Sequence, residues 1–350
     1  MKYGNPLGNG IGAEMQAYLD KTLLTNISEN TIFDRLATMQ KPLPLKNSQE
    51  IRFDKWIRMA DLYLTGNVNQ KFTGNDITKG EETLQNLAND EYKNFVLSEG
   101  SSGSSKSRMK LIKSEANVFS IGDWMPYTEE MEMFHNRWTV GETSRQMGEM
   151  AGLIIDGFYR DLYVFGAGHA TDITTANGLS LPEFTKACRT TYLALKLSGA
   201  QPVASIMTSS PNYGTVPVKA KYLGYIHTAA AEALRDNPDF VPIEKYKTGG
   251  EMEGEVGIIG EIRVIESAQA PLEYESAGKY KGTMIIVGKD HTAHVPVRGK
   301  GSTEFVFQPI GSAGSSDPLK RVGTAGWKSW LGAKVLYPER LAKITFKFEL

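Results

Sequence analysis

The chain has 350 residues and a formal net charge of −1, which excludes a wholly basic coat for nucleic acid. With 41% hydrophobic and 23% charged residues, its composition is that of a folded protein rather than a disordered one. A chain of this length can bury about three quarters of its unfolded surface. Its 35 glycines predict many turns and close backbone approaches.

Cysteine content and hydropathy indicate the cellular compartment in which the chain is expected. Cys188 is the single cysteine, so no intrachain disulfide can form and a reducing compartment is expected. No apolar core of a signal peptide follows Met1, and no run of about eighteen apolar residues occurs. We therefore expect neither secretion by that route nor a membrane partner.

Residues 1–48 predict an N-terminal arm with little core of its own. Its first residues are rich in glycine, and a modest helix is expected at residues 15–24. Pro42 and Pro44 predict an extended exit, because proline removes a backbone donor and restricts the residue before it. Such an arm must pack on something else.

Residues 51–54 and 108–113 alternate apolar and polar side chains, which predicts two half-buried strands. The long polar excursion between them ends in the flexible segment 100–105. A loop of this length is unusual inside a compact domain. We therefore expect an extended hairpin that projects onto a neighbouring subunit.

A long helix is predicted after Thr128, a plausible N-cap followed by two glutamates, where the helix dipole favours acids. Apolar residues then recur at helical spacing as far as Phe165, and this stripe is expected to be core rather than a cofactor site. Glycines inside it each cost up to about 1 kcal/mol relative to alanine. A bend or break is therefore expected near Gly141.

The rest of the chain mixes helices and strands without regular alternation, which predicts the α+β class. Helices are expected at residues 182–197 and 228–235. Strands are expected at residues 222–227, 261–265, 283–287, 305–307 and 344–348. No internal repeat occurs.

The candidate chemical motifs are weak. His291 and His294 have a spacing seen in metal sites, but no zincin glutamate accompanies them and Pro296 predicts a turn. The glycines of segments 8–12 and 250–260 fit neither a dinucleotide fingerprint nor a phosphate loop, and tight turns between strands explain the second group better. We expect no metal and no cofactor.

Catalytic residues are not expected either. Glu251, Glu253 and Glu255 could serve acid–base chemistry in a hydrolase, but their glycine-rich, polar segment predicts exposure to solvent. Cys188 lies in a predicted helix, which favours a packed thiol over a nucleophile. No Gly-x-Ser-x-Gly elbow occurs.

An ordered series of short segments resembles the major capsid proteins of tailed bacteriophages, specifically the family typified by coliphage N-four. The segments are residues 51–57, 123–130, 222–227, 234–236 and 254–267, then Asp290, Asp317-Pro318-Leu319 and Gly326-Trp327-Lys328. Each is weakly specific alone, but their order and spacing cover most of the chain. The step His227-Thr228, where the family commonly has His-Pro, and the long excursion at 67–106 depart from that pattern.

The resemblance implies the Hong Kong 97-type phage capsid fold, with an N-terminal arm, an extended hairpin, a peripheral domain built on a long spine helix, and an axial domain. The corresponding residues are 1–48 for the arm, 49–124 for the hairpin, 125–199 with 316–350 for the peripheral domain, and 200–315 for the axial domain. Arm and hairpin would bury their surface only across subunits, in large obligate interfaces.

The resemblance also implies a function: a structural shell protein of the virion and not an enzyme. Copies would form hexamers and pentamers that close into an icosahedral capsid around double-stranded DNA, assembled in the cytoplasm of the bacterial host. Portal, scaffolding and decoration proteins are the implied partners besides the chain itself. Two alternatives remain open, an encapsulin-like shell that encloses a cargo enzyme and a soluble hydrolase.

Two further features have more than one explanation. Residues 225–266 carry nine acidic against four basic side chains, and residues 319–350 carry seven basic against two acidic. Solvated faces explain this simply, and subunit complementarity or a basic inner surface toward DNA is the alternative. Trp327 and Trp330, which flank Lys328, are either core aromatics or interface anchors. Lys106 is one of many lysines available for a crosslink, and nothing distinguishes it.

Overall fold

The structure is a computed structural model of the chain, and most of the sequence can be described. The described residues are 13–37, 39–43, 50–56, 109, 111–134, 140–173, 181–203, 221–243, 254–276, 278–296, 303–312 and 318–349. The chain divides into two compact units. We call Met1–Ile51 with Ala116–Leu350 the body, and Arg52–Glu115 the hairpin unit.

The hairpin unit contains paired strands, as expected. Strand β2 (Glu50–Trp56) pairs with β3 (Leu111–Asn117) in a two-stranded sheet, and an ion pair of 2.8 Å joins Arg52 to Glu115. The second strand covers Leu111–Asn117, whereas it was predicted at residues 108–113. The polar excursion at 57–108 lies outside the described residues.

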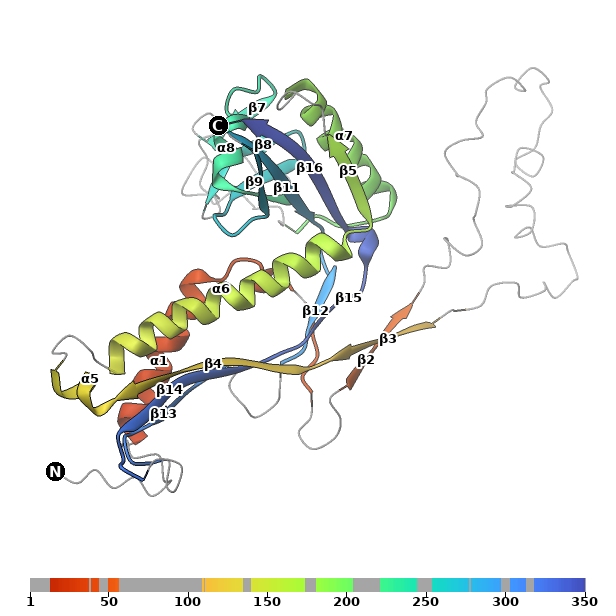
Figure 1. Cartoon of the computed structure of the whole chain (residues 1–350). Helices are drawn as coiled ribbons and strands as arrows, with labels where there is room; N and C mark the ends of the chain where they lie inside the picture. Colours follow the sequence, from red (N-terminus) through yellow and green to blue (C-terminus); the bar gives the residue numbers. More distant parts are fainter. Residues whose placement is uncertain are drawn as a thin grey trace, which may run out of the picture. The chain divides into compact units, whose positions relative to one another are not determined.

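The larger sheet of the body has eight strands, in the order β5-β16-β11-β6-β9-β8-β7, with β10 paired to β11 (Figure 1). Their bounds are β5 His169–Ile173, β6 Tyr222–Ile226, β7 Phe240–Pro242, β8 Glu255–Ile259, β9 Ile262–Glu266, β10 Leu272–Ser276, β11 Lys279–Val287 and β16 Leu341–Glu349. Helices α7 (Leu181–Leu197) and α8 (Thr228–Leu234) share a core with one face of it. The predicted helices and strands of this region are confirmed, and β5, β7, β8 and β10 are additional.

The other face of the larger sheet packs against helix α6 (Val140–Gly166) and the short 3-10 helix η1 (Asp34–Leu36). Tyr159 and Tyr163 of α6 lie in that core beside Phe33. The sheet also joins segments that the sequence analysis assigned to different domains. Strand β16 pairs with β5 on one side and with β11 on the other.

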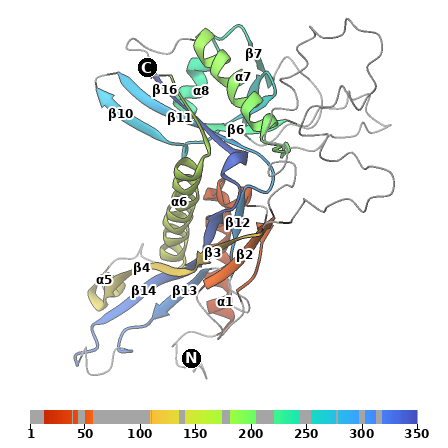
Figure 2. The same ribbon diagram turned by 90° about the vertical axis from the view of Figure 1, so that its right-hand side faces the viewer.

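A second sheet has the order β13-β14-β4, with bounds Thr303–Gln308, Val322–Leu331 and Phe119–Thr128. Its core is shared with helix α1 (Ala13–Asn30) and the first half of α6 (Figures 1 and 2). Strand β4 was not predicted. A third, small sheet, β1-β12-β15, joins Met39–Gln40, Thr292–His294 and Ala333–Val335.

The predicted long helix is present as two helices. Helix α5 covers Glu129–Phe134, and Thr128 caps it by accepting a hydrogen bond of 3.3 Å from the backbone N–H of Met131. Helix α6 begins at Val140, so Gly141 itself is helical, and residues 135–139 between the two helices lie outside the described residues.

The arm packs on its own chain, which corrects the expectation that it would bury surface only across subunits. Helix α1 runs from Ala13 to Asn30, longer than predicted, and contacts α6 and β13. Leu19 and Leu23 are buried there. The hydroxyl of Ser144 on α6 donates a buried hydrogen bond of 2.9 Å to the carbonyl oxygen of Leu19. Small residues of α6 permit this close approach, which the sequence of the arm alone could not indicate.

Candidate functional site

The two histidines of the possible metal motif have separate, structural environments. His291 is buried, and its Nδ1 lies 2.9 Å from the carbonyl oxygen of Gly288, to which it donates. Burial lowers the pKa of His291 to about 4. Nδ1 of His294 instead contacts the hydroxyl of Tyr159. Within the described ranges, no group of three His, Cys, Asp or Glu side chains is placed to hold a metal ion.

Glu255 is not exposed, which corrects the sequence analysis. Its side chain is fully buried at the start of β8, and Oε2 lies 3.6 Å from Nη1 of the buried Arg263 on β9. The burial follows from a two-residue turn, Gly260-Glu261, that folds β8 back onto β9, with Ile259 paired to Ile262. The positive φ of Gly260, 58°, suits such a turn, so the prediction of a turn glycine is confirmed here.

The remaining members of these motifs fall elsewhere. Glu251, Glu253 and segment 8–12 lie outside the described residues. Cys188 is buried in α7, and burial raises the pKa of its thiol to about 12, as expected of a packed thiol.

A serine and a histidine do meet at the end of α7, but their hydrogen bonds run the wrong way for catalysis. Nε2 of His169 lies 3.0 Å from Oγ of Ser198. The hydroxyl of Ser198 donates to the carbonyl oxygen of Ala194 at 2.9 Å, so it must accept from the histidine. A nucleophilic serine would need the opposite polarity, with the histidine accepting its proton.

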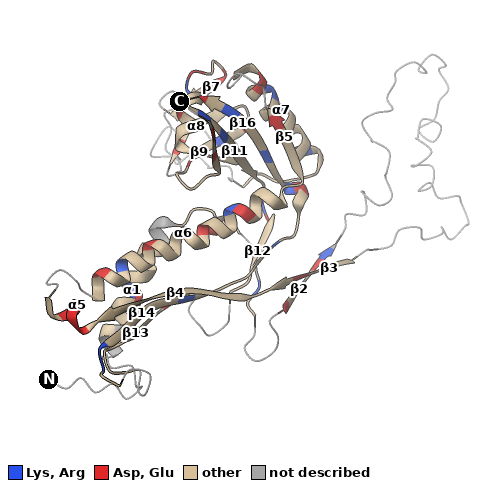
Figure 3. Ribbon diagram, viewed as in Figure 1, with Lys and Arg blue, Asp and Glu red and all other residues tan. Residues whose placement is uncertain are grey.

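Several cations of the basic segment at residues 319–350 pair with acids from other parts of the chain. Figure 3 marks the basic and acidic residues along the ribbon. Nζ of Lys328 lies 2.9 Å from Glu304, and Nζ of Lys347 lies 2.8 Å from Glu275. Arg321 pairs with Glu130. Three of its seven cations therefore form ion pairs within the subunit, which does not favour a concentrated basic surface.

Trp327 belongs to the core. It is 3% exposed on β14 and packs in the cluster that includes Leu23, Met147 and Phe305. Lys328 points to the opposite face of the strand and is exposed. The core explanation is therefore confirmed for Trp327.

Asp156 is a site that the sequence analysis missed. This carboxylate is fully buried on α6, and its Oδ1 accepts hydrogen bonds from the backbone N–H groups of Ile32, Phe33 and Asp34, at 2.8, 2.6 and 3.4 Å. The sequence carries one signal for it: an acid in the middle of the apolar stripe of a long helix, where a charge needs a partner.

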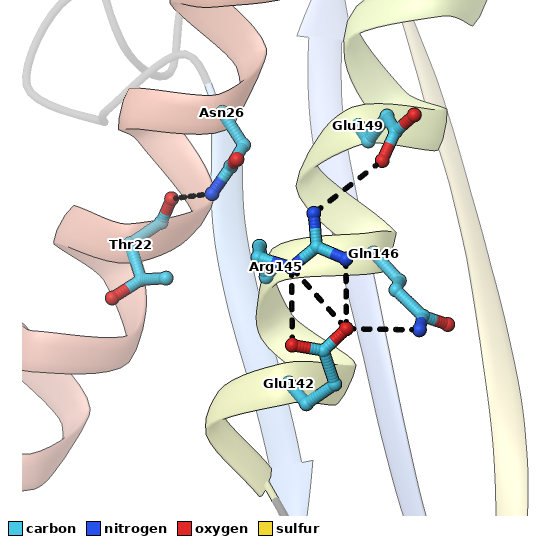
Figure 4. A network of polar contacts seen from close by, with 6 residues as sticks. All are labelled: Thr22, Asn26, Glu142, Arg145, Gln146 and Glu149. Atoms are coloured by element: carbon cyan, nitrogen blue, oxygen red, sulfur yellow. Dashed lines mark hydrogen bonds and ion pairs between the residues drawn. The ribbon is translucent and has the colours of Figure 1, made fainter.

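The outward face of α6 has two different halves. Near its start, Glu142 accepts from Arg145 at 2.7 Å and from Gln146 at 3.0 Å, and Arg145 also pairs with Glu149 (Figure 4). The hydrogen bond from Arg145 lowers the pKa of Glu142 to about 2. Further along, most of the exposed side chains of α6 are apolar. They are Leu153, Ile154, Phe158 and Phe165.

Aromatic side chains extend this apolar surface to β4. Phe119 contacts Phe158 edge to face, with the ring centroids 5.8 Å apart, and each is about half exposed. Trp124 is 65% exposed beside a pocket of about 180 Å³ on the β13-β14-β4 sheet. Contiguous exposed apolar patches are typical of interaction surfaces. None of the described helices is long and apolar enough to cross a membrane.

No protein-family model and no curated protein matches the sequence. Solved structures do match nearly the whole chain. A structure described as the capsid of the cyanophage P-SCSP1u matches with a TM-score of 0.57 and 12% identity, over 90% of this chain and 88% of that one. The capsid of Ralstonia phage GP4 gives 0.55 and 11%, over 89% and 86%.

The head structure of Helicobacter pylori bacteriophage KHP40 gives a TM-score of 0.54 at 10% identity, over 90% of this chain and 88% of that one. These matches do not distinguish the family typified by coliphage N-four from other tailed-phage capsids. They agree with the predicted α+β class. The chain therefore has the Hong Kong 97-type fold of tailed-bacteriophage capsid proteins.

Proposed function

We propose that the chain is a major capsid protein, which assembles with copies of itself into the icosahedral shell of a tailed phage. The observation that carries the proposal is the match of the fold to phage capsid structures over about nine tenths of the chain. A match of this extent covers far more of the chain than one common motif would. Hexamers and pentamers are the assembly units that we propose.

The surface of the subunit supports an assembling protein. Phe165 at the end of α6 is 84% exposed, and Phe134 at the end of α5 is 78% exposed. Burial of such a side chain contributes roughly 1.5–3 kcal/mol. Contacts with further copies would remove this surface from water.

The four parts proposed from the sequence are kept as assembly roles. We assign residues 1–48 to the arm, 49–124 to the hairpin, 125–199 with 316–350 to the peripheral domain, and 200–315 to the axial domain. The boundary between the last two crosses the eight-stranded sheet, because β16 pairs with β5 on one side and with β11, from residues 200–315, on the other. Strand β4 likewise carries the chain from the hairpin into the sheet with β14.

The proposed setting is the virion, with assembly in the cytoplasm of the host. The proposed contents are double-stranded DNA, held without sequence-specific contacts, and portal, scaffolding and decoration proteins are the proposed partners. A hydrolase has no supporting geometry among the described residues, because Glu255 is buried with Arg263 and Ser198 donates away from His169. An encapsulin-like shell would enclose a protein rather than DNA, so the contents of the particles must be identified.

Sedimentation velocity of the full chain, expressed in bacteria with a candidate scaffolding protein, tests the proposal. We expect particles that contain many copies, and DNA inside complete heads that survives nuclease treatment. Large particles that hold a protein and no nucleic acid would indicate the encapsulin-like alternative. A species of one or two chains under every condition would contradict a shell protein.

A further inference from the structure

A short segment attaches the arm to the rest of the body at two places. We call residues 31–37 and 39–43 the strap. Its second half runs parallel to β12, with Met39 opposite Ala293. The backbone N–H groups of Lys41 and Leu43 continue this pairing, donating to His294 and Pro296 at 3.3 and 2.9 Å. The strap therefore extends the smallest sheet of the body.

The first half of the strap is held by Asp156. The residue before η1, Phe33, has no side-chain cap, and the first N–H groups of any helical turn lack partners within it. Oδ1 of Asp156 accepts from three consecutive N–H groups there. A residue more than 120 positions away thus takes the part of an N-cap, joining the arm to α6.

Aromatic contacts complete the attachment. Phe33 is fully buried, with its ring centroid 5.4 Å from that of Tyr225 and 6.4 Å from that of Tyr163. The hydroxyl of Tyr163 donates to the carbonyl oxygen of Phe33 at 2.9 Å. Both the N–H and the C=O of Phe33 are therefore bound by side chains of α6.

The same contacts make a partly detached strap unfavourable. Oδ2 of Asp156 is buried and has no hydrogen-bond partner in the described part of the protein, and burial raises the pKa of this carboxyl. The three N–H groups are thus its direct support. If the strap lifted slightly, the Asp156 carboxylate would lose these three hydrogen bonds while water still could not reach it. A buried charge without hydrogen bonds is costly. If the strap lifted fully, water would hydrate the Asp156 carboxylate.

We propose that the strap and α1 form a latch that opens as one unit, with Asp156 as its positioning residue, while the eight-stranded sheet stays folded. Local opening of a terminal segment below the cost of global unfolding is common in proteins. The role of this opening rests on the proposed function. In a shell subunit, an opened arm is free to contact a second copy instead of its own α6.

Hydrogen exchange measured by mass spectrometry on the unassembled, full-length subunit tests the latch. In Asp156→Ala we expect the strap and α1 amides to exchange at least tenfold faster than in the wild type. Peptides from β11 and β16 should remain within about twofold of it. The matched control is Asp161→Ala, because Asp161 is exposed on the same helix and pairs with Arg160 at 2.9 Å. It should leave strap exchange unchanged.

Two milder variants keep the test decisive if the alanine variant does not fold. Asp156→Asn retains one oxygen acceptor, and Tyr163→Phe removes only the hydroxyl that binds Phe33. Each should accelerate exchange in the strap and α1, by less than the alanine variant, and leave the sheet unchanged. Strap exchange as slow as in the wild type, or equal acceleration in β11 and β16, would overturn the latch.

The latch proposal and the shell proposal can be refuted independently of each other. Exchange is measured before assembly, so a rigid strap would refute the latch in a protein that still forms shells. Failure of the wild type to assemble, with the expected exchange pattern in the variants, would refute the shell protein and leave the latch in place.

Discussion

At the scale of single residues, burial of His291 makes the stability of the subunit depend on pH. Its pKa, about 4, lies below the usual value of 6.5, so the folded protein binds this proton less readily than the unfolded chain. The stabilisation is complete above pH 6.5 and is lost as the pH falls toward 4. Burial lowers the pKa of His294 and His227 in the same direction. We expect His291 to account for up to about 3 kcal/mol of the loss.

Urea unfolding of the unassembled subunit at pH 7 and pH 4.5 measures this dependence. His291→Asn keeps a nitrogen donor for Gly288 but cannot titrate, so its free energy of unfolding should vary less between the two pH values. The wild type, measured at the same two pH values, is the reference. An unchanged dependence in His291→Asn would show that other groups cause the acid sensitivity.

The buried pair of Glu255 and Arg263 gives a second prediction for single residues. Removal of one partner leaves the other charge in the core, so Glu255→Met should lower the free energy of unfolding by about 3–5 kcal/mol. The double variant Glu255→Met with Arg263→Met leaves no unpaired charge and should lose less than the single one. Thermal unfolding of Glu255→Met, Arg263→Met and the double variant measures these losses. A double variant less stable than both single variants would contradict the pairing.

At the scale of elements, α1 and α6 approach closely at one glycine. A Cβ added at Gly148 would lie 2.7 Å from the carbonyl oxygen of Leu23, whereas a Cβ at Gly157 of the same helix meets nothing within 4 Å. Gly148→Ala should therefore destabilise the subunit by about 1–3 kcal/mol, because α1 must move. Gly157→Ala should stabilise it by up to about 1 kcal/mol through helix propensity.

Chemical denaturation of this matched pair separates packing from propensity, since both substitutions are identical and lie on one helix. Equal effects of the two substitutions would show that α1 does not pack against α6 in the subunit in solution. A loss of stability in Gly148→Ala together with a gain in Gly157→Ala would show that α1 packs against α6 of its own chain.

Elements were predictable where the local pattern agreed with the final packing. Thr128 indicated the start of a helix, and the apolar stripe after it predicted most of α6. Strand β4 was missed because Gly122 and Pro126 argue against a strand. Both are compatible with it: β4 is an edge strand, where proline needs no ladder donor, and a Cβ at Gly122 would lie 2.5 Å from the carbonyl oxygen of Trp327.

The missed contacts are those that pair distant segments. Asp156 was visible in the sequence only as an acid inside an apolar stripe, and its partners lie more than 120 residues earlier. Glu255 was expected in solvent because its neighbours in sequence are polar and glycine-rich. Its burial depends on a turn at Gly260 and on Arg263, and the identity of that partner follows from the register of β8 with β9.

At the scale of the whole molecule, the resemblance predicted the fold class and the capsid architecture, and the order of the strands came from the structure. Parallel pairing of β5 with β16 joins residues about 170 positions apart, so no local pattern could reveal it. The docking of α1 is similar, because the arm has little core of its own until α6 supplies one. The body and the hairpin unit are separate compact units.

Negative-stain electron microscopy of the purified full-length protein, after size-exclusion chromatography, tests the central claim most directly. We predict closed shells, tubes or ring-shaped capsomers built from many copies. A compact monomer under all conditions, including in the presence of a candidate scaffolding protein, would contradict a capsid protein.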